Sequence, residues 1–148
     1  GILGIDAAGS VISESNYKCL KNDGYDFIVT RAWESIGEFD TRAPDNLKNA
    51  QAAGYSVKNT SVYMFPCAST ANSATAQMNT MIKELKSAGA EYHMIWLDIE
   101  ENPDSGCSWA KNNIDINCDI ILALGYAATN ASKKVGVYSN HNEWGEYV

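Results

Sequence analysis

The sequence predicts one α/β domain, residues 1–148, built on a parallel β-sheet, and three observations lead to this fold class. Short apolar segments rich in β-branched and aromatic residues alternate with amphipathic segments of helical period. Five strands and four helices follow one another in strict alternation, which requires helical crossovers between parallel strands. A chain of 148 residues has the size of one globular domain. The pattern suits an open doubly wound sheet or a barrel, and both place functional loops beyond the carboxyl ends of the strands.

The first half of the chain provides two strands and two helices. A short apolar run over residues 2–6 predicts a buried strand that leads into a loop. A helix is expected over 13–22, where Ser13 supplies a cap and Gly24 a stop. Residues 25–33 are rich in β-branched and aromatic side chains and predict the second strand. The second helix covers 44–54, with proline at its start and glycine at its end.

The second half continues the alternation. The third strand covers 60–65 and is stopped by a proline. The clearest helix follows, because residues 78–89 carry one apolar stripe, including two methionines, and close on a glycine. We expect this stripe to be core packing. The fourth strand covers 94–100, apolar residues over 120–127 mark the fourth helix, and 135–139 form the fifth strand.

Composition excludes several classes of protein. The chain has 11 Lys and Arg against 18 Asp and Glu, a formal net charge of −7, so nucleic acid and anionic membranes would be repelled. No apolar run approaches the roughly 20 residues that cross a bilayer, and the first residues lack a basic leader, so we expect a mature soluble protein. The four cysteines contain no CxxC pair and the histidines number two, so neither a metal nor a cofactor is expected.

Reactive and aromatic side chains collect at the ends of the predicted strands. Because parallel strands end at one edge of a sheet, these side chains should converge there. The chain lacks GxGxxG, GxxxxGK[ST] and GxSxG motifs, which argues against nucleotide binding and serine hydrolysis. The residues are Asp6 on the first strand, Trp33 and Glu34 on the second, Tyr63 and Phe65 on the third, and Asp98 and Glu100 on the fourth.

The segment Asp98-Ile99-Glu100 gives the most specific indication of chemistry. Residues i and i+2 of a strand point to the same side, so the two carboxyl groups should share one pocket and one pKa should rise. One protonated and one ionised carboxyl group is the arrangement that glycosidases use. Two other interpretations remain open. An Asp-x-Glu at a strand end can cap a helix or pair with a surface lysine, and three carboxylates, with Asp6, can bind a divalent metal.

Six segments of the chain form one ordered set that spans nearly its whole length. They are Gly4-Ile5-Asp6, Phe27-Ile28-Val29-Thr30-Arg31-Ala32, the helix from Asn46 to Gly54, Tyr63-Met64-Phe65-Pro66, Trp96-Leu97-Asp98-Ile99-Glu100 and Val135-Gly136-Val137-Tyr138-Ser139. In this order they resemble the lysozymes of glycoside hydrolase family 25, the Chalaropsis type, and in particular their cysteine-bearing eukaryotic branch.

The resemblance implies a modified (β/α) TIM-like barrel and an N-acetylmuramidase that cuts the β-1,4 bond between N-acetylmuramic acid and N-acetylglucosamine in bacterial peptidoglycan. By position, Glu100 would be the general acid. Asp98 would act as nucleophile or general base, or orient the 2-acetamido group of the substrate, and Asp6 would hold Asp98 or a substrate hydroxyl. The substrate groove would be lined by Tyr63, Phe65 and Tyr138, and by Trp33 and Glu34, which match the family less well.

The resemblance also bears on the end of the chain and on the cysteines. Family members continue into a late strand and a further acidic residue, so the last staves of the barrel are expected to be missing after Val148. Cys67 follows the third strand and Cys107 the fourth, which places both in neighbouring loops and favours a disulfide, with two free thiols as the alternative. Cys19 and Cys118 are not expected to be neighbours.

Two other functions fit part of the pattern. A chitinase-like glycosidase also carries Asp-x-Glu at a strand end, and a sugar-binding barrel could keep the groove without cleaving. The acidic composition favours work at low pH, where repulsion from an anionic cell wall is weaker. We therefore expect a monomer that is secreted or lysosomal/phagosomal, acts on glycan strands of the wall, and contacts neither nucleic acid nor a membrane.

Overall fold

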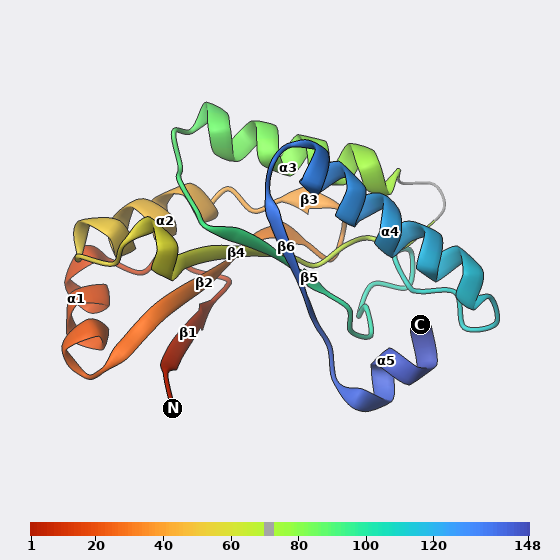
Figure 1. The fold of residues 1–148 in the computed structure, drawn as a ribbon, viewed down its shortest axis with the longest axis horizontal. Helices are drawn as coiled ribbons and strands as arrows, with labels where there is room; N and C mark the ends of the chain where they lie inside the picture. The colour runs from red at the N-terminus through yellow and green to blue at the C-terminus, as the bar shows by residue number, and fades with distance from the viewer. Residues whose placement is uncertain (70–72) are drawn as a thin grey trace.

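A computed structural model describes residues 1–69 and 73–148 of the chain and contains one sheet with helices packed against it (Figure 1). In chain order the elements are β1 (Leu3–Ala7), α1 (Glu14–Asn22), β2 (Tyr25–Glu34), β3 (Glu38–Phe39), α2 (Ala43–Ala52), the short 3-10 helix η1 (Val57–Asn59), β4 (Thr60–Met64), α3 (Ala74–Ser87), β5 (Met94–Asp98), α4 (Ile114–Asn130), β6 (Lys134–Tyr138) and α5 (His141–Tyr147).

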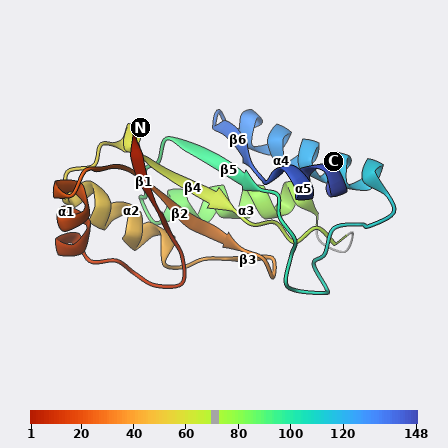
Figure 2. The same ribbon diagram turned by 90° about the horizontal axis from the view of Figure 1, so that it is seen from below.

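The strands of the sheet follow one another in chain order, β1-β2-β4-β5-β6, and every neighbouring pair is parallel (Figure 2). A doubly wound sheet reverses direction at a switch point, whereas a barrel adds each strand beside the last. The order therefore selects the barrel type of winding and confirms the predicted parallel α/β fold. Within the described residues the sheet is not closed, and β1 and β6 form its two edges.

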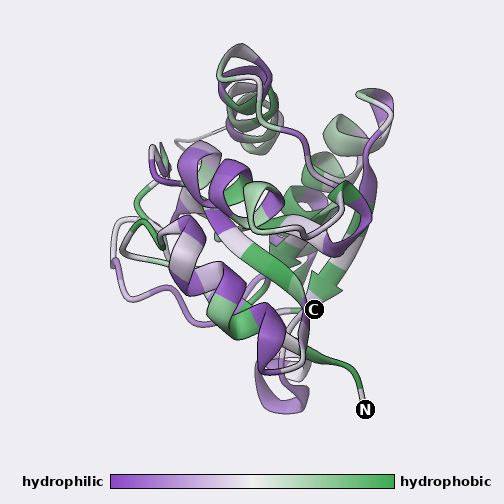
Figure 3. Ribbon diagram, turned by 90° about the vertical axis from the view of Figure 1, so that its left-hand side faces the viewer, coloured by the Kyte–Doolittle hydropathy of each residue, from purple (hydrophilic) through white to green (hydrophobic). Residues whose placement is uncertain are grey.

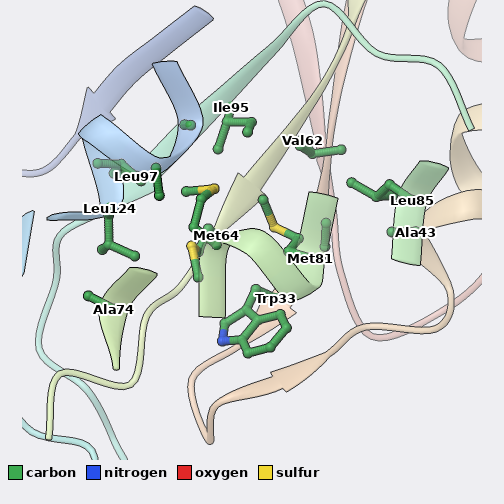
Figure 4. Close-up of a cluster of buried hydrophobic side chains, with 14 of the residues drawn as sticks. Trp33, Ala43, Val62, Met64, Ala74, Met81, Leu85, Ile95, Leu97 and Leu124 are labelled. Carbon is green, nitrogen blue, oxygen red and sulfur yellow. The ribbon is translucent and has the colours of Figure 1, made fainter. Parts of the chain in front are cut away.

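One face of the sheet forms the hydrophobic core with the helices. Ile28 packs against α1 and α2, while Val62, Met64, Ile95 and Leu97 pack against α3 and α4. Figure 4 shows Met64 and Met81 at the centre of this cluster, and Figure 3 shows apolar strands beneath helices with polar outer faces. The predicted methionine stripe is confirmed as core packing. The larger cluster includes the fully buried α3 side chains Met78, Met81 and Leu85.

The opposite face of the sheet, here called the inner face, carries the alternate residues of each strand. Register pairs Arg31 with Tyr63 and Tyr63 with Trp96, so these side chains form a row across three strands. Asp6 and Asp98 stand on the same face near the carboxyl ends of β1 and β5. The helices α1 to α4 leave this face uncovered, so polar side chains there can meet a ligand.

Two glycines allow aromatic rings to lie flat on the inner face. A Cβ at Gly136 would stand 2.6 Å from a ring carbon of Trp96, its partner across β5 and β6. A Cβ at Gly4 would overlap the ring of Phe27, its partner across β1 and β2. Real side chains do not approach so closely, so glycine is required at both positions by the rings that cover them.

Gly136→Ala is expected to destabilise the protein by about 1–3 kcal/mol, because the added methyl group forces the Trp96 ring out of its place. Urea unfolding followed by circular dichroism measures the change. Gly125→Ala is the matched control, since nothing lies within 4 Å of its Cβ position in α4 and helix propensity alone should make it stabilising. Equal stability of Gly136→Ala and the parent would show that the ring does not occupy this position.

The structure corrects the predicted elements at β3, α4, β5 and α5. The fourth strand ends at Asp98 rather than at residue 100, because the chain then turns to satisfy hydrogen bonds with other loops. The strand β3 was not predicted; it forms where a turn at Gly37, with φ of 88°, folds the chain back on β2. The helix α5 was also not predicted, and α4 begins at Ile114, earlier than its apolar stripe. No helix among the described residues is long and apolar enough to span a bilayer.

Candidate active site

Asp98 and Glu100 form a carboxyl pair at the carboxyl end of β5. Asp98 is the last residue of the strand and is 8% exposed, while Glu100 is half-buried two residues later. The two carboxyl groups act on each other: burial, and then the Glu100 carboxyl, raise the pKa of Asp98, so the pair holds a proton below that pKa. The predicted pairing on one side of the chain is therefore present, although Glu100 lies beyond the strand itself.

The environment of the pair favours retention of that proton. Burial raises the pKa of Asp98 to about 7, and the negative charges of Glu100 and Asp6 add to the effect. Burial also raises the pKa of Glu100, followed by the charge of Glu143, while the hydrogen bond from Asp98 lowers it. Asp98 Oδ1 is buried and has no hydrogen-bond partner within residues 1–69 and 73–148. The pair therefore holds one proton up to near neutral pH.

Hydrogen bonds to the backbone fix the direction of Glu100. The Ile99 N–H donates to the Tyr138 carbonyl at 2.8 Å, and the Ser139 hydroxyl donates to the Ile99 carbonyl at 2.6 Å. The Trp109 indole N–H donates to the Glu100 carbonyl at 2.9 Å. The residues on either side of the pair are thus attached to β6 and to the loop before α4, so Glu100 is held in place without strand pairing of its own.

Asp6 on β1 and Arg31 on β2 lie on the same inner face of the sheet as Asp98. Asp6 as a whole residue is exposed, but its carboxyl group is partly buried. This burial raises the pKa of Asp6, and the charge of Arg31 opposes the increase. The Arg31 guanidinium is held by Asp40, whose Oδ2 accepts from Nε at 3.0 Å. The Asp40 side chain is 1% exposed, and its Oδ1 also accepts from Arg42 Nε at 2.6 Å. This network holds the Arg31 guanidinium in place, and its positive charge acts on Asp6 as a counter-ion.

The predicted aromatic residues are placed unequally. Burial, and then the charge of Asp6, raises the pKa of Tyr63, which is half-buried in the middle of the inner face. Tyr138 pairs with Asp98 in register and is 58% exposed, and the Glu100 charge is the main cause that raises its pKa. Phe65 is half-buried just after β4. The structure therefore brings Tyr63 and Tyr138 together with Asp6, Asp98 and Glu100.

The prediction that Trp33 lines a substrate groove is wrong. Trp33 is 4% exposed in the core beside Met81, and its indole N–H donates to Gln77 Oε1 at 3.0 Å (Figure 4). A register shift between Arg31 and Trp33 in the pairing of β2 with β4 interrupts the alternation and turns the ring to the core face of the sheet, away from the inner face. Glu34 accepts from Arg42 and lies 3.5 Å from Arg31, so its carboxylate is engaged in ion pairs. Its contact with substrate stays a prediction.

The predicted disulfide between Cys67 and Cys107 is confirmed. It joins the loop after β4 to the loop after β5, and the Ala68 N–H donates to the Cys107 carbonyl at 2.9 Å beside it. Cys19 is exposed on α1 and Cys118 is partly buried on α4, and neither forms a disulfide in the described part of the chain. The bridge therefore connects two loops at the edge of the sheet that carries the carboxyl pair.

The sequence analysis missed one carboxylate of the site, Glu143. It lies on α5 and its Oε1 accepts from the Glu101 N–H at 3.1 Å. A local signal for this helix exists, because Asn140 caps it and accepts from the Asn142 and Glu143 amides at 3.1 and 3.0 Å. The same pattern could not show that Glu143 reaches a loop 42 residues earlier.

The site has no metal-binding arrangement in the described ranges, where no group of three or more His, Cys, Asp or Glu side chains could hold an ion. Asp6 lies on β1 and Asp98 on β5, and Asp98 Oδ1 has no hydrogen-bond partner among the described residues. The arrangement suits proton transfer by carboxyl groups.

The raised pKa of Asp98 predicts a pH dependence of stability. A carboxyl group whose pKa rises on folding, here from 3.8 to about 7, stabilises the folded protein at low pH, and this contribution is lost as pH rises through about 7. Asp98→Asn removes the loss, so its stability relative to the parent should increase by about 2–4 kcal/mol between pH 4 and pH 8. Urea unfolding at several pH values measures the difference, with Asp119→Asn, an exposed carboxylate on α4, as the control. Parallel curves for Asp98→Asn and the parent would show that folding does not raise the pKa of Asp98.

Known proteins resemble this chain over almost all of its length. The family model described as lysozyme-like protein 1 matches residues 2–148. The Dictyostelium discoideum protein "Probable GH family 25 lysozyme 2" is 38% identical over 97% of this chain and 63% of its own. "Lysozyme-like protein 5" of Caenorhabditis elegans is 36% identical over 98% of this chain and 64% of its own. The chain thus spans less than two thirds of the length of these relatives.

A solved structure shows the same fold. The muramidase from Trichobolus zukalii superposes with a TM-score of 0.74 over 99% of this chain and 69% of its own, at 19% sequence identity. The superposition shows that the sequential parallel sheet and its helices match the fold of that structure, and it supports a TIM-like fold for this sheet. With the family model and the curated relatives, it confirms the resemblance seen in the motifs: the chain belongs to the lysozyme-like protein 1 family, among relatives of the glycoside hydrolase family 25 lysozymes.

Proposed function

We propose that this protein is a glycoside hydrolase that cleaves the β-1,4 bond between N-acetylmuramic acid and N-acetylglucosamine in bacterial peptidoglycan. The observation that carries the proposal is the Asp98–Glu100 pair, which keeps one proton near neutral pH at the carboxyl end of a barrel strand. A proton donor and a second carboxyl group beside it are what glycosidic cleavage requires. The names of the curated relatives as lysozymes agree with this chemistry.

In this mechanism the proton that Asp98 holds at rest passes to Glu100, and Glu100, the more exposed member of the pair, donates it to the leaving oxygen. Asp98 is then left as a carboxylate beside the positive charge that develops on the sugar. It acts either as a nucleophile or general base, or by orienting the 2-acetamido group so that its oxygen displaces the leaving group. Asp6 remains charged next to Arg31 and contributes a further negative charge to this surface.

The inner face provides the contacts for sugar rings. Tyr63 and Tyr138 flank the pair and can present flat apolar surfaces together with hydroxyl groups. Phe65 and Glu34, at the ends of β4 and β2, extend the same edge of the sheet. We assign these four residues to substrate binding.

The chemistry of the chain fits an acidic, oxidising location. A disulfide persists where thiols are not kept reduced, and loss of the shared proton above about pH 7 would stop acid catalysis. At low pH the net charge of −7 would also become less negative, which weakens the repulsion between the chain and an anionic cell wall. We therefore propose a secreted or lysosomal/phagosomal protein with an antibacterial or digestive role, working as a monomer.

Hydrolysis of purified peptidoglycan tests the proposal. The loss of turbidity of a wall suspension is followed at pH 5, and the soluble fragments are sized by mass spectrometry, with chitin oligosaccharides as a parallel substrate. Fragments with N-acetylmuramic acid at the reducing end support a muramidase. Cleavage of chitin alone would indicate a chitinase-like enzyme, and binding to the wall without any cleavage by the folded chain would indicate a sugar-binding protein.

A further inference from the structure

Glu143 is held at both of its carboxylate oxygens. Oε1 accepts from the Glu101 N–H at 3.1 Å, and Oε2 accepts from the side-chain amide of Asn140. Asn140 is itself fixed as the cap of α5, because its Oδ1 accepts from the amides of Asn142 and Glu143. The carboxylate is therefore oriented by its own helix and attached to the backbone immediately after Glu100.

The hydrogen bond between Glu101 and Glu143 adds to other contacts between the segment after β5 and the segments β6 and α5. Before Glu100, Ile99 exchanges hydrogen bonds with Tyr138 and Ser139, at 2.8 and 2.6 Å. After Glu100, the Glu101 amide is held by Glu143. Since Glu100 lies past the end of its strand, its direction depends on these flanking contacts. On the carboxyl-terminal side, Glu143 holds the Glu101 amide and the Trp109 indole N–H holds the Glu100 carbonyl.

The Glu143 charge also acts on the pair. It is the second cause, after burial, of the raised pKa of Glu100, and it adds to the raised pKa of Asp98. Asp98 is more than nine-tenths buried, and its Oδ1 has no partner in the described ranges, so a second negative charge in the pair would be poorly compensated. The other titratable or charged groups that act on the pair or on its neighbours are Asp6 from β1, Arg31 from β2, Tyr63 from β4 and Tyr138 from β6.

We propose that Glu143 is a positioning residue for the Asp98–Glu100 pair: its carboxylate anchors the turn that carries Glu100, and its negative charge keeps the shared proton in the pair. The catalytic part of this inference rests on the proposed function. The part that concerns the proton is independent of any hydrolysis. Glu143 does not itself touch the reacting atoms.

Three substitutions separate the two roles. Glu143→Gln keeps an oxygen that can accept from the Glu101 amide and removes the charge. Glu143→Asp keeps the charge and shortens the side chain, so it weakens the anchor. Glu143→Ala removes both. Glu146→Gln is the matched control, because Glu146 is an exposed carboxylate on the same helix that raises the pKa of Tyr147 instead.

Carbon-13 NMR titration of the labelled side-chain carboxyl groups measures the protonation of the Asp98–Glu100 pair directly. In Glu143→Gln and Glu143→Ala, the upper apparent pKa of the pair should fall by roughly 0.5 or more, and in Glu143→Asp and Glu146→Gln it should stay near that of the parent. An unchanged titration in Glu143→Gln, or an equal change in Glu146→Gln, would overturn the electrostatic role. Circular dichroism confirms that each variant is folded before it is compared.

Kinetic measurements on peptidoglycan test whether Glu143 anchors the turn that carries Glu100. Glu143→Ala should lower kcat about 10- to 100-fold with little change in KM, because a misplaced Glu100 affects the transition state more than substrate binding. Glu143→Gln should lower kcat less and move the alkaline limb of the pH profile to lower pH. A kcat of Glu143→Ala equal to that of the parent would contradict anchoring. If the parent itself cleaves no glycan, the proposed function fails while the NMR result still decides the role of the charge.

Discussion

Replacing Glu100 with glutamine is expected to lower the rate of peptidoglycan hydrolysis by about 10²- to 10⁴-fold, with the protein still folded. Glutamine has nearly the same shape, so the loop that holds residue 100 should keep its contacts through the backbone with Trp109. What the variant loses is the carboxyl group that shares a proton with Asp98. Without that proton the leaving oxygen departs with an uncompensated negative charge, which is the cost that general acid catalysis removes.

The measurement is the initial rate of release of reducing ends from peptidoglycan at pH 5, for the parent and the variant at equal concentration. Glu101→Gln is the control, because it removes a neighbouring exposed carboxylate without touching the pair. Its rate should stay within a few fold of the parent. A Glu100→Gln variant that keeps most of its activity would assign the proton donor to another group, and Asp98, with its pKa near 7, would be the next to replace.

Removal of the disulfide by the double substitution of Cys67 and Cys107 with alanine is expected to lower stability by about 4 kcal/mol. The bridge closes a loop with a sequence separation of 40, and the chain-entropy model assigns a loop of that size about this value. Both cysteines are buried, at 0% and 6% exposed, so packing is lost as well. The midpoint of thermal unfolding should fall by roughly 10 °C.

Thermal unfolding under oxidising conditions measures this difference, and the parent in the presence of a reducing agent should approach the double variant. Cys19→Ala is the control, because Cys19 is exposed and forms no disulfide in the described structure. A midpoint for the double variant equal to that of Cys19→Ala would show that hydrogen bonds such as Ala68 to Cys107 already hold the two loops. The consequence for the site follows from the position of the bridge, since it joins the loop that leaves Glu100 to the loop after β4.

The sequence predicted the parts of the site that depend on local spacing. Asp98 and Glu100 are two residues apart at a strand end, and this spacing predicted their pairing, although the structure places Glu100 in the turn beyond the strand. Asp6 lies one residue before the end of the first strand, as the sequence led one to expect. The Cys67–Cys107 bridge was also predictable, because loops that follow neighbouring parallel strands meet at one edge of the sheet.

Trp33 shows where the same reasoning fails. Its position at the end of a strand predicts an accessible ring, but a register shift just before it turns the indole into the core, where Gln77 accepts its N–H. A bulge depends on the pairing of β2 with β4, which is decided by residues about thirty positions apart. No pattern within the strand itself distinguishes the two outcomes.

From the sequence one could predict the alternation of five strands and four helices, the sequential parallel sheet that the family motifs imply, and the carboxyl groups of Asp98 and Glu100 at the end of β5, but not β3 or α5. The predicted features follow from hydrophobic periodicity and i, i+2 spacing, which are properties of short segments. The tertiary structure alone decided that Asp98 is buried enough to keep a proton and that Glu143 joins the turn after Glu100. Burial and long-range hydrogen bonds depend on which segments meet in space, and in this chain the atoms concerned come from β1, β5 and α5, which are far apart in sequence.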